Sequence, residues 1–220
     1  MKNFTEYILE KLKLSKKTAS TVQNDFVDLG LPSGTLWKQH DLGINVDHAS
    51  FDAYKGWYGH LYAWGETKSK DNGLDWASYK FSDNEGKEFS KYNKKDKLKD
   101  LEPEDDAAAN EDPKWSIPTK EDFMELEDNT KHEWKNGYNG VKNLDGMLFT
   151  SNKNGETLFI PSSYQWREKG ITSPSMWLAT ANTENVQQAL AMKFDKKHDW
   201  CLYTPEPKYN LYRIRPVIKK

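Results

Sequence analysis

The amino-acid sequence predicts an α+β fold with short antiparallel strands, a few short helices and long ordered loops. Two observations support this prediction: glycine and asparagine divide the chain into short segments, and the C-terminal third has the pattern of extended chain. A third is composition, because only 36% of the 220 residues are hydrophobic while nine are tryptophan and eleven are tyrosine. Large rings must therefore fill much of the core. Such a core suits a loop-rich domain better than a leucine-built helical bundle.

The N-terminal residues are predicted to lie outside the main domain. Four apolar side chains fall on one helical face: Phe4, Tyr7, Ile8 and Leu12. Residues 1–13 are therefore predicted to form an amphipathic helix, residues 14–24 a polar linker, and residues 25–220 one domain. An isolated helix of this length is marginal in water, so we expect a partner protein for it. Charges interrupt the apolar positions, unlike in a signal peptide, so we expect cytoplasmic synthesis without an ordinary export signal.

Two segments in the first half of the domain have clear local patterns. Residues 27–46, "VDLGLPSGTLWKQHDLGINV", predict a strand, a turn and a second strand, with Trp37 buried. The segment "PEDDAAAN" predicts a short helix that begins at Pro103. Proline is favoured in the first helical turn, and the acidic residues that follow it suit the positive end of the helix dipole.

The segment "SIPTKEDFMELEDN" predicts a strand, a corner and a helix. Thr119 can cap the helix, and Asp122 lies three residues later, as in a capping box. Phe123 and Leu126 are three residues apart, so one face of the helix can be buried.

The C-terminal third is predicted to be mainly extended. Residues 147–151 and 157–160 are predicted to form a hairpin, because Asn154 and Gly155 suit a type I′ turn. From Met176 onwards the pattern is that of strands. The segment "LYRIRPV" alternates apolar and basic side chains, as a half-buried strand does.

Composition and motifs exclude several classes of function. The formal net charge is -2, so no nucleic-acid partner is expected. Basic residues alternate with acidic ones in "SKYNKKDKLKDLEPEDD", so that run is interpreted as a solvated polar face. The sequence has no zinc-ligand spacing, phosphate-binding loop, dinucleotide motif or nucleophile elbow. No cofactor, metal or membrane span is predicted. Cys201, the single cysteine, is expected to be a half-buried thiol in a strand.

Two features leave alternatives open. One acidic run either holds calcium or caps and solvates a helix start: Glu102, Glu104, Asp105 and Asp106. The phrase "GWYGHLYAWGET" is rich in rings: Trp57, Tyr58, Tyr62 and Trp64. Such rings either stack on sugars and bases or fill a core, and the neighbouring glycines favour the core.

The order of several phrases is specific, although each is weak alone: "VDLGLPSGTLW", "GHLYAWGET", "EDDAA", "WSIPTKEDFMEL", "GMLFT…NGETLFIP", "MWLAT" and "YRIRPV". Over about residues 27–217 the chain resembles the bacterial major paralogous domain family of the Fibrobacter succinogenes type, which is common in gut Bacteroidetes. That family is similar in fold to C-type lectin-like domains and to the formylglycine-generating enzyme. The chain departs from its pattern at Ser116, at residues 176–179 and at residues 162–175.

The resemblance implies a C-type lectin-like fold whose early phrases are scaffold. It implies a core that includes Trp37, Trp64, Trp115 and Trp177. The leading hypothesis is a non-enzymatic recognition module that displays variable C-terminal loops and binds a protein or glycan on a cell surface. The candidate ligand-binding residues are of the aromatic and polar types favoured in adaptable binding sites: Tyr164, Trp166, Arg167, Asn182, Asn185, Asp199, Trp200 and Tyr203. The alternative is that Trp200 and Tyr203 belong to the core.

Other functions remain as alternatives. The chain resembles, in its "RIRPV" ending, the variable proteins of diversity-generating retroelements, so it could be phage- or prophage-encoded and released with phage particles. It could then be a structural component of a phage tail or surface fibre, attached through the N-terminal helix. Formylglycine-type chemistry would need a cysteine pair, and the chain has only Cys201. A glycan-active enzyme is less favoured, although sequence spacing does not reveal paired carboxylates.

Overall fold

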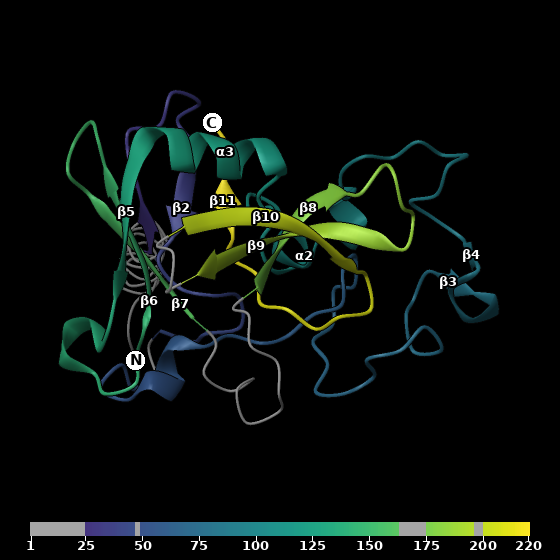
Figure 1. The fold of residues 1–220 in the computed structure, drawn as a ribbon, viewed down its shortest axis with the longest axis horizontal. Helices are drawn as coiled ribbons and strands as arrows, with labels where there is room; N and C mark the ends of the chain where they lie inside the picture. Colours follow the sequence, from purple (N-terminus) through teal and green to yellow (C-terminus); the bar gives the residue numbers. More distant parts are fainter. Residues whose placement is uncertain (1–24, 47–48, 163–174, 196–199) are drawn as a thin grey trace, which may run out of the picture.

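A computed structural model describes residues 25–46, 49–162, 175–195 and 200–220. Figure 1 shows their arrangement. The predicted N-terminal helix and linker lie outside the described residues. Four of the candidate ligand-binding residues also lie outside them: Tyr164, Trp166, Arg167 and Asp199.

The described chain is a mixed α+β structure of short antiparallel strands and few helices, which confirms the predicted class. Its α-helices are α2 (Ala107–Glu111) and α3 (Lys120–Asn129). Its 3-10 helices are η1 (Tyr54–Trp57), η2 (Asn84–Gly86), η3 (Pro103–Asp105) and η4 (Tyr138–Gly140). Its strands are β1 (Phe26–Val27), β2 (Leu36–Lys38), β3 (Ser82–Asp83), β4 (Glu88–Phe89), β5 (Thr130–Lys135), β6 (Gly146–Ser151), β7 (Thr157–Pro161), β8 (Ser175–Ala181), β9 (Gln188–Asp195), β10 (Trp200–Pro207) and β11 (Val217–Ile218).

The strands form three three-stranded sheets and one two-stranded ribbon. Their orders are β1-β2-β11, β10-β9-β8, β5-β6-β7 and β3-β4. In Figure 1 the β5-β6-β7 sheet lies at one end of the molecule and the β3-β4 ribbon at the other, with β10-β9-β8 between them. The C-terminal strand β11 pairs with β2, which ties the end of the chain to the first sheet. The extended C-terminal third is thus confirmed for the residues described.

Two hydrophobic clusters lie on opposite faces of the β10-β9-β8 sheet. Trp177 of β8 and its cross-strand neighbour Ala191 belong to the first cluster, which also contains Trp64. Met176 and its cross-strand neighbour Met192 belong to the second. Side chains alternate between the two faces of a strand, so one sheet serves both clusters. The two clusters are therefore not independent cores.

The tryptophan predictions are confirmed in three positions of four. Trp37, Trp64 and Trp177 are at most 1% exposed. The indole Nε1 atoms of Trp64 and Trp177 donate to the carbonyls of Leu178 and Tyr62, both at 2.8 Å. A large ring can be buried without cost to its polar atom when that atom has such a partner.

Trp115 departs from this prediction because it is only partly buried and packs at the edge of the first cluster. Its ring lies 5.6 Å from that of Phe26, and the Nζ atom of Lys38 lies 4.4 Å above it. In the phrase "GWYGHLYAWGET", Tyr62 and Trp64 are buried, whereas Trp57 and Tyr58 are half-buried.

Helix capping follows the local sequence signals. Thr119 accepts a hydrogen bond from the backbone of Asp122, whose carboxylate accepts from Thr119 N, so the predicted capping box of α3 is present. Phe123 and Leu126 of that helix are fully buried, as predicted. The predicted helix at "PEDDAAAN" is divided into η3 and α2, because Asp106 has an extended backbone and caps α2 through the N–H groups of its first turn.

The predicted hairpin is present as β6 and β7, but its turn is not of type I′. Gly155 has a positive φ of 76°, whereas Asn154 does not have the positive φ that a type I′ turn requires at both positions. Instead Ser151 N donates to Glu156 O at 2.9 Å, and Gly155 N donates to Ser151 O at 3.2 Å, so the loop is longer than two residues. The Asn154 side-chain amide donates to Asp28 O at 2.8 Å and holds this loop against the first sheet.

The interpretation of "LYRIRPV" as a half-buried strand is wrong. Arg213 and Arg215 are 2% and 1% exposed, and both lie against the fully buried Asp41. Arg213 Nη1 is 2.7 Å from one carboxylate oxygen of Asp41, and Arg215 Nη2 is 2.7 Å from the other. A carboxylate distant in sequence allows these basic side chains to enter the interior.

Candidate functional site

The described candidate residues do not form one site. Asn182 and Asn185 lie in the turn between β8 and β9, and Trp200 begins β10. Tyr203 pairs with Met192 in the β10–β9 ladder, four residues along the strand from the Pro207 position beside the turn. Four strand residues span roughly 13 Å. The structure thus separates Tyr203 from the asparagine turn.

The two asparagines hold the β8–β9 turn in shape. Asn182 Oδ1 accepts from Glu184 N at 3.1 Å, and its Nδ2 donates to Gln188 Oε1 at 3.0 Å. Asn185 Oδ1 accepts from Gln187 N at 3.0 Å. Asparagine stabilises turns through such bonds to nearby backbone. These contacts give both residues a structural role, and their contact with a ligand stays a prediction.

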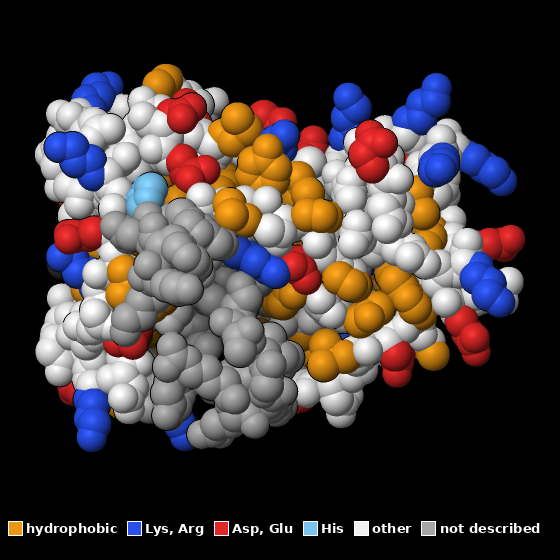
Figure 2. Space-filling view, in the orientation of Figure 1, with side chains coloured by type: hydrophobic (Ala, Val, Ile, Leu, Met, Phe, Trp, Pro, Cys, Tyr) orange, Lys and Arg blue, Asp and Glu red, His pale blue; other side chains and the backbone are white. Residues whose placement is uncertain are grey.

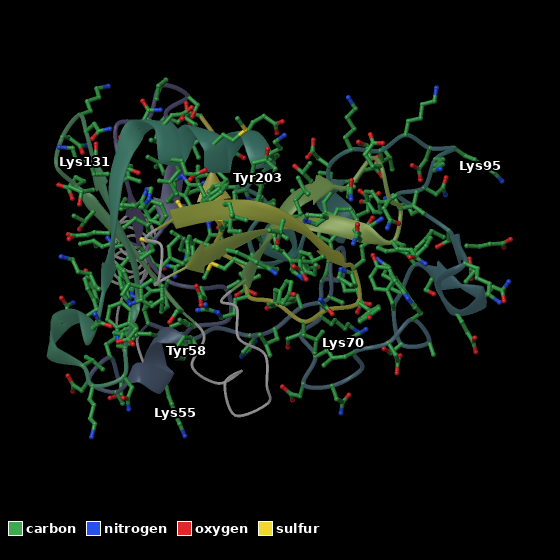
Figure 3. All side chains as sticks on the ribbon, viewed as in Figure 1. Lys55, Tyr58, Lys70, Lys95, Lys131 and Tyr203 are labelled. Atoms are coloured by element: carbon green, nitrogen blue, oxygen red, sulfur yellow. The ribbon has the colours of Figure 1, made fainter. Side chains whose placement is uncertain are left out.

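Tyr203 is half-buried and belongs partly to the core. Its ring packs against the second cluster, and the Nζ atom of Lys120 lies 4.7 Å from the ring centroid. The side-chain hydrogen bond to Tyr203 raises the pKa of Lys120 above its ordinary value. Figure 3 places Tyr203 above β10, on the side that faces α3. This packing agrees in part with the alternative that Tyr203 belongs to the core.

A hollow lies beside the asparagine turn, between that turn and residues 93–99. Its volume is about 320 Å³, which is within the size range of small-molecule sites. Its lining residues are Tyr92, Asn93, Lys94, Lys97, Leu98, Lys99, Ala181, Asn182, Thr183 and Val186. Three of these are lysines and none is acidic. Apolar side chains and lysines therefore share one concave surface.

A second hollow of about 370 Å³ continues from the first. The two share Asn93, Lys94 and Val186. The second is also lined by Asp83, Lys87, Glu88, Phe89 and Lys95. We call the two hollows together the lysine groove. Figure 2 shows basic side chains along the edge of this end of the molecule, with acidic ones among them, where Figure 3 labels Lys95.

The acidic residues of the 93–100 loop are exposed, like its lysines, but they bond to groups of the protein and do not line the first hollow. The Asp96 carboxylate accepts from the backbone N–H groups of Asn93 and Leu98 at 3.2 and 3.0 Å. Asp100 Oδ1 accepts from Thr180 Oγ1 at 2.6 Å. The lysines of the groove are exposed. A run whose charge is balanced in sequence therefore presents mainly positive side chains in the first hollow.

Sequence reasoning missed this groove. It interpreted "SKYNKKDKLKD" as a solvated polar face because acidic and basic residues alternate. The signal that could have found it is the spacing of Asn93 and Asp96, since these residue types cap turns and then leave the intervening lysines outside.

Buried groups fix the base of the loop. Lys208 is 1% exposed, and its Nζ atom donates to Tyr92 O at 3.1 Å and lies 4.8 Å above the Trp64 ring. Burial lowers the pKa of Lys208 to about 8. Tyr92 is 2% exposed, and its hydroxyl donates to Asp105 Oδ2 at 2.8 Å. The floor of the lysine groove is thus anchored to the first cluster.

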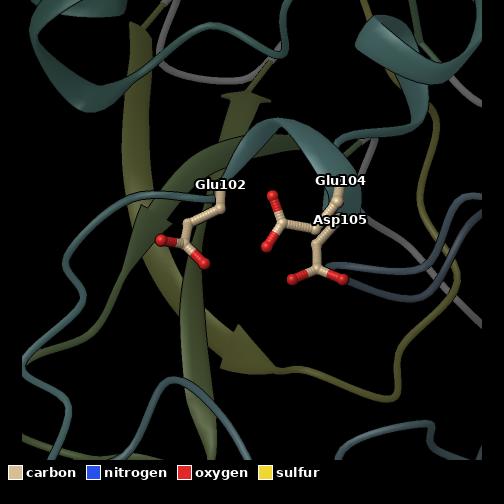
Figure 4. Close-up of side chains that lie close together, drawn as sticks. All are labelled: Glu102, Glu104 and Asp105. Atoms are coloured by element: carbon tan, nitrogen blue, oxygen red, sulfur yellow. The ribbon is translucent and has the colours of Figure 1, made fainter.

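An acidic cluster lies under the same loop. The carboxylates of Glu102, Glu104 and Asp105 lie close together, as Figure 4 shows. Lys91 Nζ lies 2.5, 2.8 and 2.6 Å from them, respectively. Burial lowers the pKa of Lys91, but the hydrogen bonds that its ammonium donates to these carboxylates outweigh burial and raise the pKa above its ordinary value. An ammonium group therefore occupies the position that a calcium ion would take.

Cys201 lies in β10 and is buried, which confirms its placement in a strand. Its thiol donates to Glu127 Oε1 at 3.0 Å and lies 3.8 Å from His132 Nδ1. Sequence reasoning missed the approach of Cys201 to His132, because these residues are 69 positions apart.

Comparison of the chain with protein-family models, with curated proteins and with solved structures returned no match. The resemblance of the sequence to the major paralogous domain family therefore stays a prediction. Within the described ranges, every helix is too short or too polar to cross a bilayer.

Proposed function

We propose that the chain is a non-enzymatic recognition module on a C-type lectin-like scaffold. Its ligand binds in the lysine groove, between the β8–β9 turn and residues 93–99. The observation that supports this most directly is the first hollow, which combines an apolar floor with polar and charged groups around it. The ordered set of scaffold phrases in the sequence also supports the proposal.

The walls of the groove are loops held by the scaffold, which is the usual arrangement of a binding site. Ala181 N donates to Lys99 O at 2.7 Å, so the lysine loop pairs with the end of β8. Gln187 Nε2 donates to Gly86 O at 2.9 Å, which ties the asparagine turn to the β3-β4 ribbon. Substitutions of exposed groove residues should therefore change binding more than stability.

The test is a matched pair of substitutions read on an array of neutral and acidic oligosaccharides. Thr183 is exposed and lines the first hollow, so Thr183→Trp should fill it and weaken binding at least about tenfold. Thr157 is also exposed but lies on β7, near the opposite end of the molecule (Figure 1), so Thr157→Trp should leave binding unchanged.

Two results would contradict the proposal. If the parent protein binds a ligand and Thr183→Trp binds it equally well, the site lies elsewhere. If incubation with a bound polysaccharide releases reducing ends, the protein is a glycan-active enzyme instead of a pure binding module.

A further inference from the structure

We propose that the ligand of the lysine groove is an acidic polysaccharide, recognised through its carboxylate or sulfate groups. This inference rests on the proposed function and adds the ligand class to it.

The groove has an excess of unpaired positive charge. Lys94, Lys97 and Lys99 line the first hollow, which has no acidic residue in its lining. Lys87 and Lys95 extend the row into the second hollow, where Asp83 and Glu88 are the acidic residues. None of these five lysines forms an ion pair with another described residue, whereas Lys91 beneath them contacts three carboxylates. Each lysine can therefore bind an external anion without first breaking an internal pair.

Two acidic side chains of the 93–100 loop have hydrogen-bond partners within the protein. Asp96 is held by two backbone N–H groups, and Asp100 accepts from Thr180. Reorienting either of them to neutralise a lysine would cost these hydrogen bonds. Both carboxylates keep their charge, but they lie outside the lining of the first hollow. The charged residues described in that lining are all lysines, which would raise the local concentration of a polyanion.

The ligand is expected to be a polymer with spaced charges. Lysine presents a point charge on a flexible side chain, whereas arginine is preferred where a single carboxylate is bound through two parallel hydrogen bonds. The row of exposed lysines passes from one hollow into the next through their shared residues. A chain that carries an anionic group on successive sugar units can follow this row and contact several lysines at once.

A nucleic acid fits the groove less well than an acidic polysaccharide. Proteins that bind single strands stack bases on aromatic side chains. The two aromatic residues that line the groove, Tyr92 and Phe89, are 2% and 9% exposed, so neither offers a ring face to a base. The polar groups of Asn93 and Thr183 beside the lysines are suited to hydroxyl groups of a sugar instead.

The experiment measures binding of four polymers to the whole protein by calorimetry, at about 50 mM and about 300 mM salt. Polygalacturonate carries carboxylates, dextran sulfate carries sulfates, dextran is neutral, and a single-stranded thymidine oligonucleotide carries phosphates. The first two are expected to bind, more weakly at high salt, and the stronger of them shows which anionic group the groove prefers. Dextran and the oligonucleotide are expected to bind at least about tenfold more weakly.

Two triple variants locate the binding. Lys94→Gln, Lys97→Gln and Lys99→Gln together should weaken acidic-polymer binding about ten- to hundredfold, since each exposed charge contact contributes about two- to fivefold. The control changes Lys55, Lys131 and Lys142 to Gln, which removes the same charge from exposed positions elsewhere. Figure 3 shows Lys55 and Lys131 far from Lys95. The control should change binding less than about twofold, and both variants should melt like the parent.

Four outcomes would overturn the inference. Equal losses in the two triple variants would show attraction to net charge alone. Tighter binding of the oligonucleotide would make the ligand a nucleic acid, and failure of both acidic polymers to bind would exclude the ligand class. If dextran binds as tightly as the acidic polymers and Thr183→Trp abolishes its binding, the proposed function stands and only the ligand class is wrong.

Discussion

Replacing Asp41 with asparagine tests whether the buried charge cluster holds the two ends of the domain together. Asp41 is 0% exposed and is shared by Arg213 and Arg215. Burial lowers the pKa of Arg215, and the carboxylate of Asp41 opposes this effect. Asp41→Asn keeps the size of the side chain and removes its charge. Two guanidinium groups then remain side by side in the interior without an anion.

The expected cost follows from the energetics of buried ion pairs. Removal of one partner from such a pair destabilises a protein by about 3–5 kcal/mol, because it leaves an uncompensated charge. Here one substitution leaves two uncompensated charges. Arg213 also donates to Pro161 O at 2.5 Å, however, and Arg215 donates to Gln39 O. These carbonyl partners offset part of the loss, so we expect about 4 kcal/mol. For a chain of this size, that lowers the melting temperature by about 8–16 °C.

The assay is urea unfolding followed by tryptophan fluorescence, supported by thermal unfolding. Glu133→Gln is the control, because Glu133 forms an ion pair with Lys135 whose side chains are 56% and 37% exposed. Its expected cost is below about 1 kcal/mol. If Asp41→Asn is no more destabilising than this control, the cluster does not stabilise the fold and its charges are better solvated than the structure indicates.

Two further predictions concern buried side chains. Trp177→Ala should lower the free energy of unfolding by about 3–5 kcal/mol, because the ring is fully buried and its indole donates to Tyr62 O. Unfolding in urea measures this change, and a midpoint like that of the parent would contradict the placement of Trp177 in the core. Burial lowers the pKa of Lys208 from 10.5 to about 8. Between about pH 8 and about pH 10.5 the unfolded chain therefore binds more protons than the folded chain, so the free energy of unfolding should rise with pH over that interval. Urea unfolding at about pH 8 and about pH 10 measures this rise, and Lys208→Met should remove it. If the free energy of unfolding of the variant rises with pH as steeply as that of the parent, Lys208 is not the titrating group.

Local sequence signals were sufficient for the elements whose cause is local. Thr119 and Asp122 are three residues apart and cap the same helix, so their pattern could be recognised without knowledge of the fold. The β6–β7 hairpin was also predicted, although its loop was not, because Asn154 binds the carbonyl of Asp28, which follows β1 in the first sheet. The alternation in "LYRIRPV" misled for the same reason, since Asp41 lies 172 positions from Arg213.

The Asn182–Asn185 turn lies on the proposed groove, whereas Tyr203 lies away from it, and contact of any of these residues with a ligand stays a prediction. The lysines opposite that turn were missed because the charge of a hollow depends on which side chains line it in the folded chain. Counting charges treats Asp96 and Lys97 as equal and opposite. In the folded chain Lys97 lines the first hollow and Asp96 does not, so a count along the sequence does not give the charge of that surface.

The fixed base of the lysine loop has a consequence for affinity. Binding that orders a flexible loop loses free energy to conformational entropy, and a loop that is already held avoids this cost. Lys208 supports the Tyr92 carbonyl from below, Asp105 accepts from the Tyr92 hydroxyl, and Lys99 pairs with Ala181 beside it. The backbone of the groove is therefore set before a ligand arrives, and only the lysine side chains remain to be ordered. Weak contacts from several lysines can then add up to specific binding, because they do not have to offset the ordering of the loop as well.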